Sequence, residues 1–283
     1  MLARAGASSL LSLLAAGLLS VSAGAAPAAK SVTKSEDKVA ATLSWQQDSD
    51  SFGNPTFSAL HLQIQREGKA VYDAAVSSTE CEPCGLEEFK GAPAPLQVTE
   101  LEGNGEPNVL LSLYTGGAHC CSVLQILYYD PASATYLLSQ HNFGDPTPRV
   151  ADVAGDYRKE LESADDRFAY EFTAYAYSGL PIQIWRFSKG HLRDATRQFP
   201  AAIKADAKAQ LRRFRGQRRH GYGLGFIAAW AADEELLGHR TAVNRLLASE
   251  ARLHNLRSAD RLSPGGLGFV QKLKRFLKKT GYS

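Results

Sequence analysis

Residues 98–109 read VTELEGNGEPNV and residues 150–161 read VADVAGDYRKEL, two copies of a short strand that enters an acidic, glycine-containing turn and leaves as a second strand. Oxygen-bearing side chains recur at equivalent positions, which pair Glu100 with Asp152, Asn104 with Asp156, and Asn108 with Glu160. Alternating oxygens in a tight turn wrap a hard cation, and glycine permits the turn. Such oxygens otherwise cap local backbone N–H groups. The repeat therefore predicts paired β-strands and leaves both uses of the turn open.

The two turns resemble the FG-GAP or VCBS type of repeat, whose pattern is Asp-x-Asp-Gly-Asp-Gly-x-x-Asp and which builds β-propeller blades with calcium loops. The resemblance implies calcium ligands at Glu100, Glu102, Asn104 and Asn108 and, more weakly, at Asp152, Asp156 and Glu160. Fewer acids in the first turn, and Ala154 and Tyr157 in the second, lower the expected affinity. Two repeats cannot close a propeller, which takes typically four or more blades, so we expect an open β-rich domain.

A second resemblance covers residues 116–121, GGAHCC, which are similar to a segment of uncharacterised exported bacterial proteins; it implies no activity. Export is also predicted by residues 1–25. Arg4 supplies a positive start, residues 10–21 are apolar but too short to span a bilayer, and residues 23–25 are a small-residue cleavage site. Residues 26–38 have little to bury and are predicted to be a flexible lead. We expect a secreted or periplasmic protein without a transmembrane segment.

The four cysteines, Cys81, Cys84, Cys120 and Cys121, lie within a short stretch of the chain, and export permits disulfides. Adjacent residues on a strand point to opposite faces. We therefore expect crossed pairing, in which Cys81 and Cys84 each bond one of Cys120 and Cys121. The alternative is one Cys81–Cys84 disulfide and one Cys120–Cys121 disulfide. A four-thiolate zinc site is the remaining alternative.

Charge divides the chain into two halves. From Lys204 onward there are 17 Lys and Arg against 6 Asp and Glu, a net charge of +11, which leaves −8 for residues 1–203 of a chain whose total is +3. The densest positive run predicts an anion-binding surface at Arg212, Arg213, Arg215, Arg218 and Arg219. Its partner would be an anionic envelope component such as lipid headgroups, cell-wall polymer or polysaccharide, or another protein, and not nucleic acid. Alternatively, the two halves neutralise each other.

The overall expectation is an α+β chain. An antiparallel, blade-like β-rich domain over 39–200 precedes a small basic helical domain over 201–283, whose helices are expected at 201–215, 224–237, 241–256 and 267–279. A strand with aromatics on one face is expected at 168–176.

Two functions remain open at this point. The first is non-catalytic binding or cell-envelope association. The alternative is a hydrolase of an extracellular polymer, with catalytic groups among Asp152, Asp165, Asp166 and His119, or a carboxylate pair that includes Glu171. A deep pocket that gathers these side chains would favour the enzyme, and an exposed patch of arginine and lysine would favour the binding protein.

Overall fold

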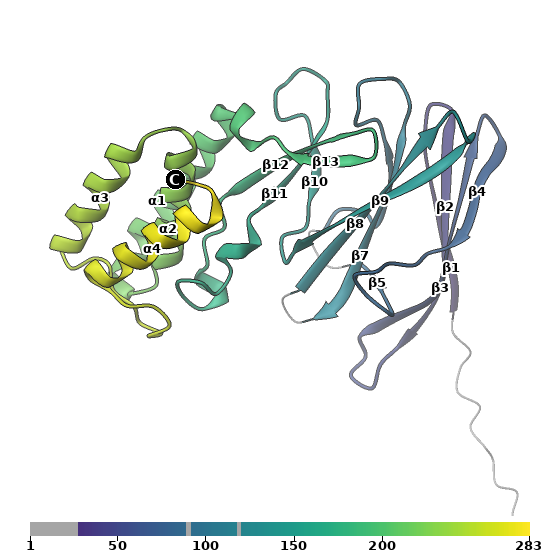
Figure 1. Ribbon diagram of the computed structural model, residues 1–283. Coiled ribbons are helices and arrows are strands. Elements are labelled where there is room, and N and C mark those ends of the chain that lie inside the picture. The colour runs from purple at the N-terminus through teal and green to yellow at the C-terminus, as the bar shows by residue number, and fades with distance from the viewer. Residues whose placement is uncertain (1–27, 89–91, 118–119) are drawn as a thin grey trace, which may run out of the picture.

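The computed structural model describes residues 28–88, 92–117 and 120–283; the predicted signal sequence lies outside the described residues. Three antiparallel sheets follow one another, and four helices pack beyond the third (Figure 1). The first sheet contains β1 (Ala28–Glu36), β2 (Val39–Ser49), β3 (Pro55–Arg66) and β4 (Lys69–Ala75). The second contains β5 (Gly85–Leu86), β6 (Leu96–Thr99), β7 (Asn108–Gly117), β8 (Cys120–Asp130) and β9 (Thr135–Gly144).

The third sheet is formed by β10 (Arg149–Ala151), β11 (Glu160–Ala164), β12 (Ile182–Ser188) and β13 (His191–Asp194). None of the described strand orders closes on itself. The helical unit contains α1 (Pro200–Gln217), α2 (Leu224–Leu236), α3 (Arg240–Arg252) and α4 (Gly266–Thr280). The α+β prediction of an open β-rich part followed by four helices is thus confirmed.

The second sheet is covered on both faces. Val109, Leu111 and Leu113 of β7 pack toward the first sheet, whereas Leu110 packs toward the third. Successive side chains of a strand point to opposite faces, so a strand buried on both sides needs an almost continuous apolar run. Residues 109–113, VLLSL, provide that run.

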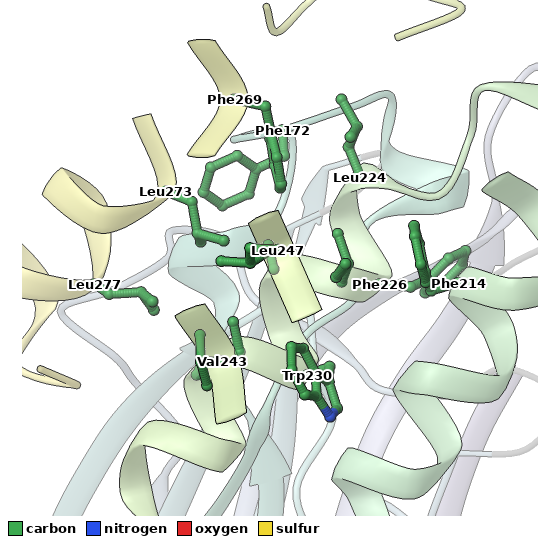
Figure 2. Packing of buried hydrophobic residues seen from close by; sticks show 14 of the residues in the cluster. Phe172, Phe214, Leu224, Phe226, Trp230, Val243, Leu247, Phe269, Leu273 and Leu277 are labelled. Atoms are coloured by element: carbon green, nitrogen blue, oxygen red, sulfur yellow. The ribbon is translucent and has the colours of Figure 1, made fainter. Parts of the chain in front are cut away.

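The helices have a core of their own. Residues 224–233 of α2 are buried all round, as expected for a helix that is apolar on every side. Figure 2 shows the side chains that surround it, contributed by α1, α3, α4 and the segment before β12. A smaller cluster of Ile184, Ala195 and Phe199, with Ala202 packed against it, joins the third sheet to the start of α1. The face of α1 that meets the sheet is therefore fixed by apolar contacts.

Two predicted segments are wrong. Ala28–Glu36 is not a flexible lead, because it forms β1 and pairs along its whole length with Val39–Gln47 of β2. Residues 168–176 do not form a strand. They connect two 3-10 turns, Asp166–Phe168 and Tyr175–Tyr177, and place Phe168 and Phe172 in the helical core. The aromatic alternation in this segment reflects insertion between helices and not sheet pairing.

Candidate functional site

The two acidic turns have the same hydrogen bonds. In the first turn, Asn104 N–H donates to Glu100 and Leu101 N–H donates to Asn108, at 3.0 and 3.1 Å. In the second, Asp156 N–H donates to Asp152 and Val153 N–H donates to Glu160, at 3.0 and 3.2 Å. Each turn joins two antiparallel neighbours, β6 to β7 in the second sheet and β10 to β11 in the third. The repeat predicted from the sequence is therefore also a repeat of local structure.

The second turn has Tyr157 at the position where the first turn has Gly105. Gly105 has φ of +72°, and its equivalent, Tyr157, has φ of +70°. A non-glycine residue with positive φ is strained. Both carboxylate oxygens of Asp152 accept backbone N–H groups, from Gly155, Asp156 and Tyr157. These bonds hold the tyrosine backbone in the conformation that the turn requires.

The turn oxygens are committed to the protein. Glu100 accepts the backbone N–H groups of Glu102 and Asn104, while Glu102 accepts the N–H of Lys189. In the part of the chain that the structure describes, no group of three or more His, Cys, Asp or Glu side chains is placed to hold a metal ion. The arrangement matches the capping of backbone N–H groups that the sequence left open as the alternative to calcium.

If the oxygens of the two turns act only as caps of backbone N–H groups, calcium does not stabilise the protein. We expect the same melting temperature in chelator and in 5 mM Ca²⁺, roughly the upper limit for weak extracellular sites, because a ligand that binds the folded state raises it. Differential scanning fluorimetry measures this directly. A rise in melting temperature that Glu102→Ala removes would instead establish the calcium site implied by the FG-GAP resemblance.

The cysteines pair locally. Cys81 bonds Cys84 and Cys120 bonds Cys121, and no described cysteine is free, so the expected crossed pairing is wrong. The sheet supplies the reason. Gly85 pairs with Tyr114 of β7, which pairs on its other side with Ser122 of β8. One strand thus separates the two cysteine pairs, and two strand spacings of about 4.8 Å exceed the 7 Å between Cα atoms that a disulfide tolerates.

The residues proposed for a hydrolase do not form one site. Asp165 and Asp166 line a groove of about 580 Å³ with His141 and Trp185, whereas Asp152 lines a different hollow beside β6. Asp165 is buried and is held by Arg167 Nε at 2.8 Å and by the Tyr282 hydroxyl at 2.9 Å. These bonds tie the β-rich part to the end of α4.

The other residues proposed for the hydrolase lie in different surroundings. Burial raises the pKa of Asp166, which accepts the backbone N–H of Asp145. Glu171 pairs with Lys272 of α4 at 3.1 Å, and His119 lies outside the described residues. Burial also lowers the pKa of His141, whose ring lies 4.7 Å from that of Trp185. The described residues proposed for a hydrolase are therefore divided between separate places in the fold, and Asp165 and Asp166 are the pair that shares a groove with His141.

A row of positive charge lies along one face of α1. We define the cationic stripe as five exposed residues spaced four, four, three and four apart: Lys204, Lys208, Arg212, Arg215 and Arg219. At about 100° per residue, the four members within α1 fall inside an arc of roughly 80°, and the whole stripe runs for about 22 Å. No member makes an ion pair with any described residue. Like charges at this spacing oppose helix formation, so an external anion would relieve the repulsion.

The structure revises the predicted anion-binding set. Arg212, Arg215 and Arg219 belong to the stripe. Arg218 does not, because both of its bonds from Nη1 go to the Glu250 carboxylate at 2.9 Å. Arg213 lies on another side of α1, with its guanidinium 5.9 Å from the centre of the Phe226 ring. Lys204 and Lys208 were missed, although their spacing of four residues from each other and from Arg212 was visible in the sequence.

The described acidic residues of the β-rich part form no salt bridge with the stripe. Their salt bridges lie mainly within the β-rich part. Glu106 binds Lys38 and Arg66, Glu160 binds Arg186, and Glu162 binds Arg149. Of the 17 Lys and Arg side chains from Lys204 onward, three form ion pairs with described residues: Arg218, Arg240 and Lys272. Only the Lys272 pair crosses from the helices to the segment before β12. The positive charge of the helical unit therefore faces outward.

Comparison with known proteins identifies two relatives. A probable thylakoid lumen protein of Synechocystis sp. is 30% identical over 164 residues, which are 51% of this chain and 44% of that protein. An uncharacterized protein of Sinorhizobium fredii is 28% identical over 137 residues, which are 47% of this chain and 21% of that protein. The chain thus spans less than half the length of each. No family model matches the chain, and no solved structure matches it. No helix among the described residues is long and apolar enough to cross a bilayer.

Proposed function

We propose that this protein acts in an exported compartment and binds an anionic component of the cell envelope through the cationic stripe of α1. The observation that carries the proposal is the row of five exposed cations without a carboxylate partner among the described residues. Similarity to a probable thylakoid lumen protein supports the exported location, as does the predicted signal sequence.

The stripe suits a repeating or extended anion. Its length of about 22 Å exceeds a single phosphate or carboxylate group many times over. The apolar contacts of Ile203, Ala207 and Phe214 hold the opposite side of α1 in the protein, so the cations are presented on a rigid helix. Binding through such a surface is electrostatic and should weaken as salt screens it.

The test is binding of the full chain to polyphosphate and to vesicles of phosphatidylglycerol and phosphatidylcholine, at 50 and 300 mM salt. Reversing Lys208, Arg212 and Arg215 to Glu should weaken binding by about 100-fold or more at low salt, because each cation near an anionic surface contributes about 1 kcal/mol. Wild-type affinity should fall steeply between the two salt concentrations.

A matched variant controls for net charge. Lys30, Lys34 and Lys69 are exposed residues of the first sheet, and reversing them to Glu changes the total charge by the same amount. This variant should bind nearly as well as the wild type. Equal weakening by the two variants, or a wild-type protein that binds neither probe, would refute the role of the stripe.

A further inference from the structure

The chain exposes three leucines between the end of α3 and the first turn of α4. Leu253, Leu262 and Leu267 are 63, 56 and 69% exposed. Three of the eight large hydrophobic side chains that the described residues expose thus lie within fifteen residues. In Figure 1 this segment lies at the edge of the helical unit remote from the first sheet. Three exposed leucines in one short segment make it a candidate contact surface.

The segment is held in place, so its leucines are not exposed by fraying. Gly266 N–H donates to Leu256 O at 2.8 Å, and Leu256 is buried in the helical core. Asp260 accepts the Thr173 hydroxyl at 2.5 Å and the backbone N–H groups of Ala174 and Leu262. The fixed backbone presents the leucine side chains to solvent.

Charge around the leucines is positive. Arg252, Arg257 and Arg261 are exposed and interleave with them. Asp260 is the one acid of residues 252–267, all of them described, and its hydrogen bonds turn it toward Thr173 and its neighbours. The segment therefore offers apolar side chains surrounded by cations and no outward carboxylate.

The segment is continuous with the cationic stripe. Ala259 N–H donates to Gly221 O at 3.1 Å, and Gly221 follows the short 3-10 turn Arg218–His220 that contains Arg219, the last residue of the stripe. The backbone of this segment therefore lies beside the end of the stripe. Leucines among cations complement a surface that is apolar below a layer of negative charge, which describes an anionic bilayer and not a hydrated polymer.

We propose that residues 253–267 form a membrane-interface anchor, in which the three leucines enter the headgroup and acyl boundary of an anionic bilayer. The flanking arginines and the stripe contact the lipid phosphates. This inference rests on the proposed function and specifies lipid as the anionic component.

Replacing Leu253, Leu262 and Leu267 together with Ser tests the anchor in the full chain. Affinity for phosphatidylglycerol-containing vesicles at 300 mM salt should fall at least tenfold, because screening leaves the apolar contact as the main attraction. Affinity for polyphosphate at 50 mM salt should not change. Replacing Phe52, Leu137 and Leu138 with Ser removes exposed apolar side chains elsewhere and should leave vesicle binding intact.

The outcomes separate the two proposals. Unchanged vesicle binding by the leucine variant at an unchanged melting temperature would overturn the anchor. So would an equal loss of polyphosphate binding, because that would indicate general damage to the helical unit. Salt-sensitive binding of the wild type to polyphosphate but not to vesicles would overturn the anchor and leave the stripe as the binding surface. Absence of binding to both probes would overturn both.

Discussion

Gly225→Ala should lower the melting temperature by about 2–12 °C. Overpacking a close contact costs roughly 1–3 kcal/mol, and 1 kcal/mol corresponds to about 2–4 °C for a protein of this size. Gly225 lies in the first turn of α2, where the helix backbone contacts the turn before β12. A Cβ there would lie 2.8 Å from Gly179 N and 2.9 Å from Ser178 Cα, and would also meet Tyr177 O. These neighbours are backbone atoms, which cannot move aside as a flexible side chain can.

A second glycine in the same unit provides the control. Gly216 lies in α1, and a Cβ added there has nothing within 4 Å. Gly216→Ala should raise stability by up to about 1 kcal/mol, because alanine is the better helix former. Thermal melting by circular dichroism compares the two variants. If both change the melting temperature by the same amount and in the same direction, the close approach at Gly225 does not determine how α2 docks.

Asp233→Asn should stabilise the protein near neutral pH by more than about 1 kcal/mol, because one unit of pKa difference between the folded and unfolded states corresponds to about 1.4 kcal/mol. Asp233 is fully buried in α2, and neither of its carboxylate oxygens has a hydrogen-bond donor. Burial and the nearby carboxylates of Asp206 and Glu234 raise its pKa well above the ordinary range. Asparagine is neutral at every pH, so it avoids the cost of burying a carboxylate near Asp206 and Glu234.

The sign of the pH dependence follows from the raised pKa. The folded protein holds a proton on Asp233 that the unfolded chain releases above its pKa of about 3.9, so the stability contributed by this group falls as pH rises from there. The advantage of Asp233→Asn should therefore grow with pH above about 4 and become constant once the folded-state carboxyl has also ionised. Urea unfolding between pH 4 and 8 measures it. An advantage that shrinks with rising pH would be incompatible with a raised pKa.

Local patterns determined much of the architecture. The apolar run of β7, the strands β2, β3 and β4 of the first sheet and the four helices of the helical unit were all predictable, because each pattern reflects the period of its own element. The repeated acidic turns were also predictable, since their hydrogen bonds connect residues within one turn. The charge difference between the two halves followed from composition alone.

Tertiary structure decided which of these features could act. Disulfide pairing depended on β7 lying between the two cysteine pairs, and sequence spacing contains no information about that separation. The cationic stripe required knowing which side of α1 is buried and that Glu250 engages Arg218. The segment 168–176 was mistaken for a strand because its alternating aromatic residues indicate which side chains are buried. The alternation does not indicate whether a sheet or a set of helices buries them. Sequence thus fixes local conformation through short-range periodicity and hydrogen bonding, whereas pairing, burial and the exposure of charge depend on residues brought together from distant positions.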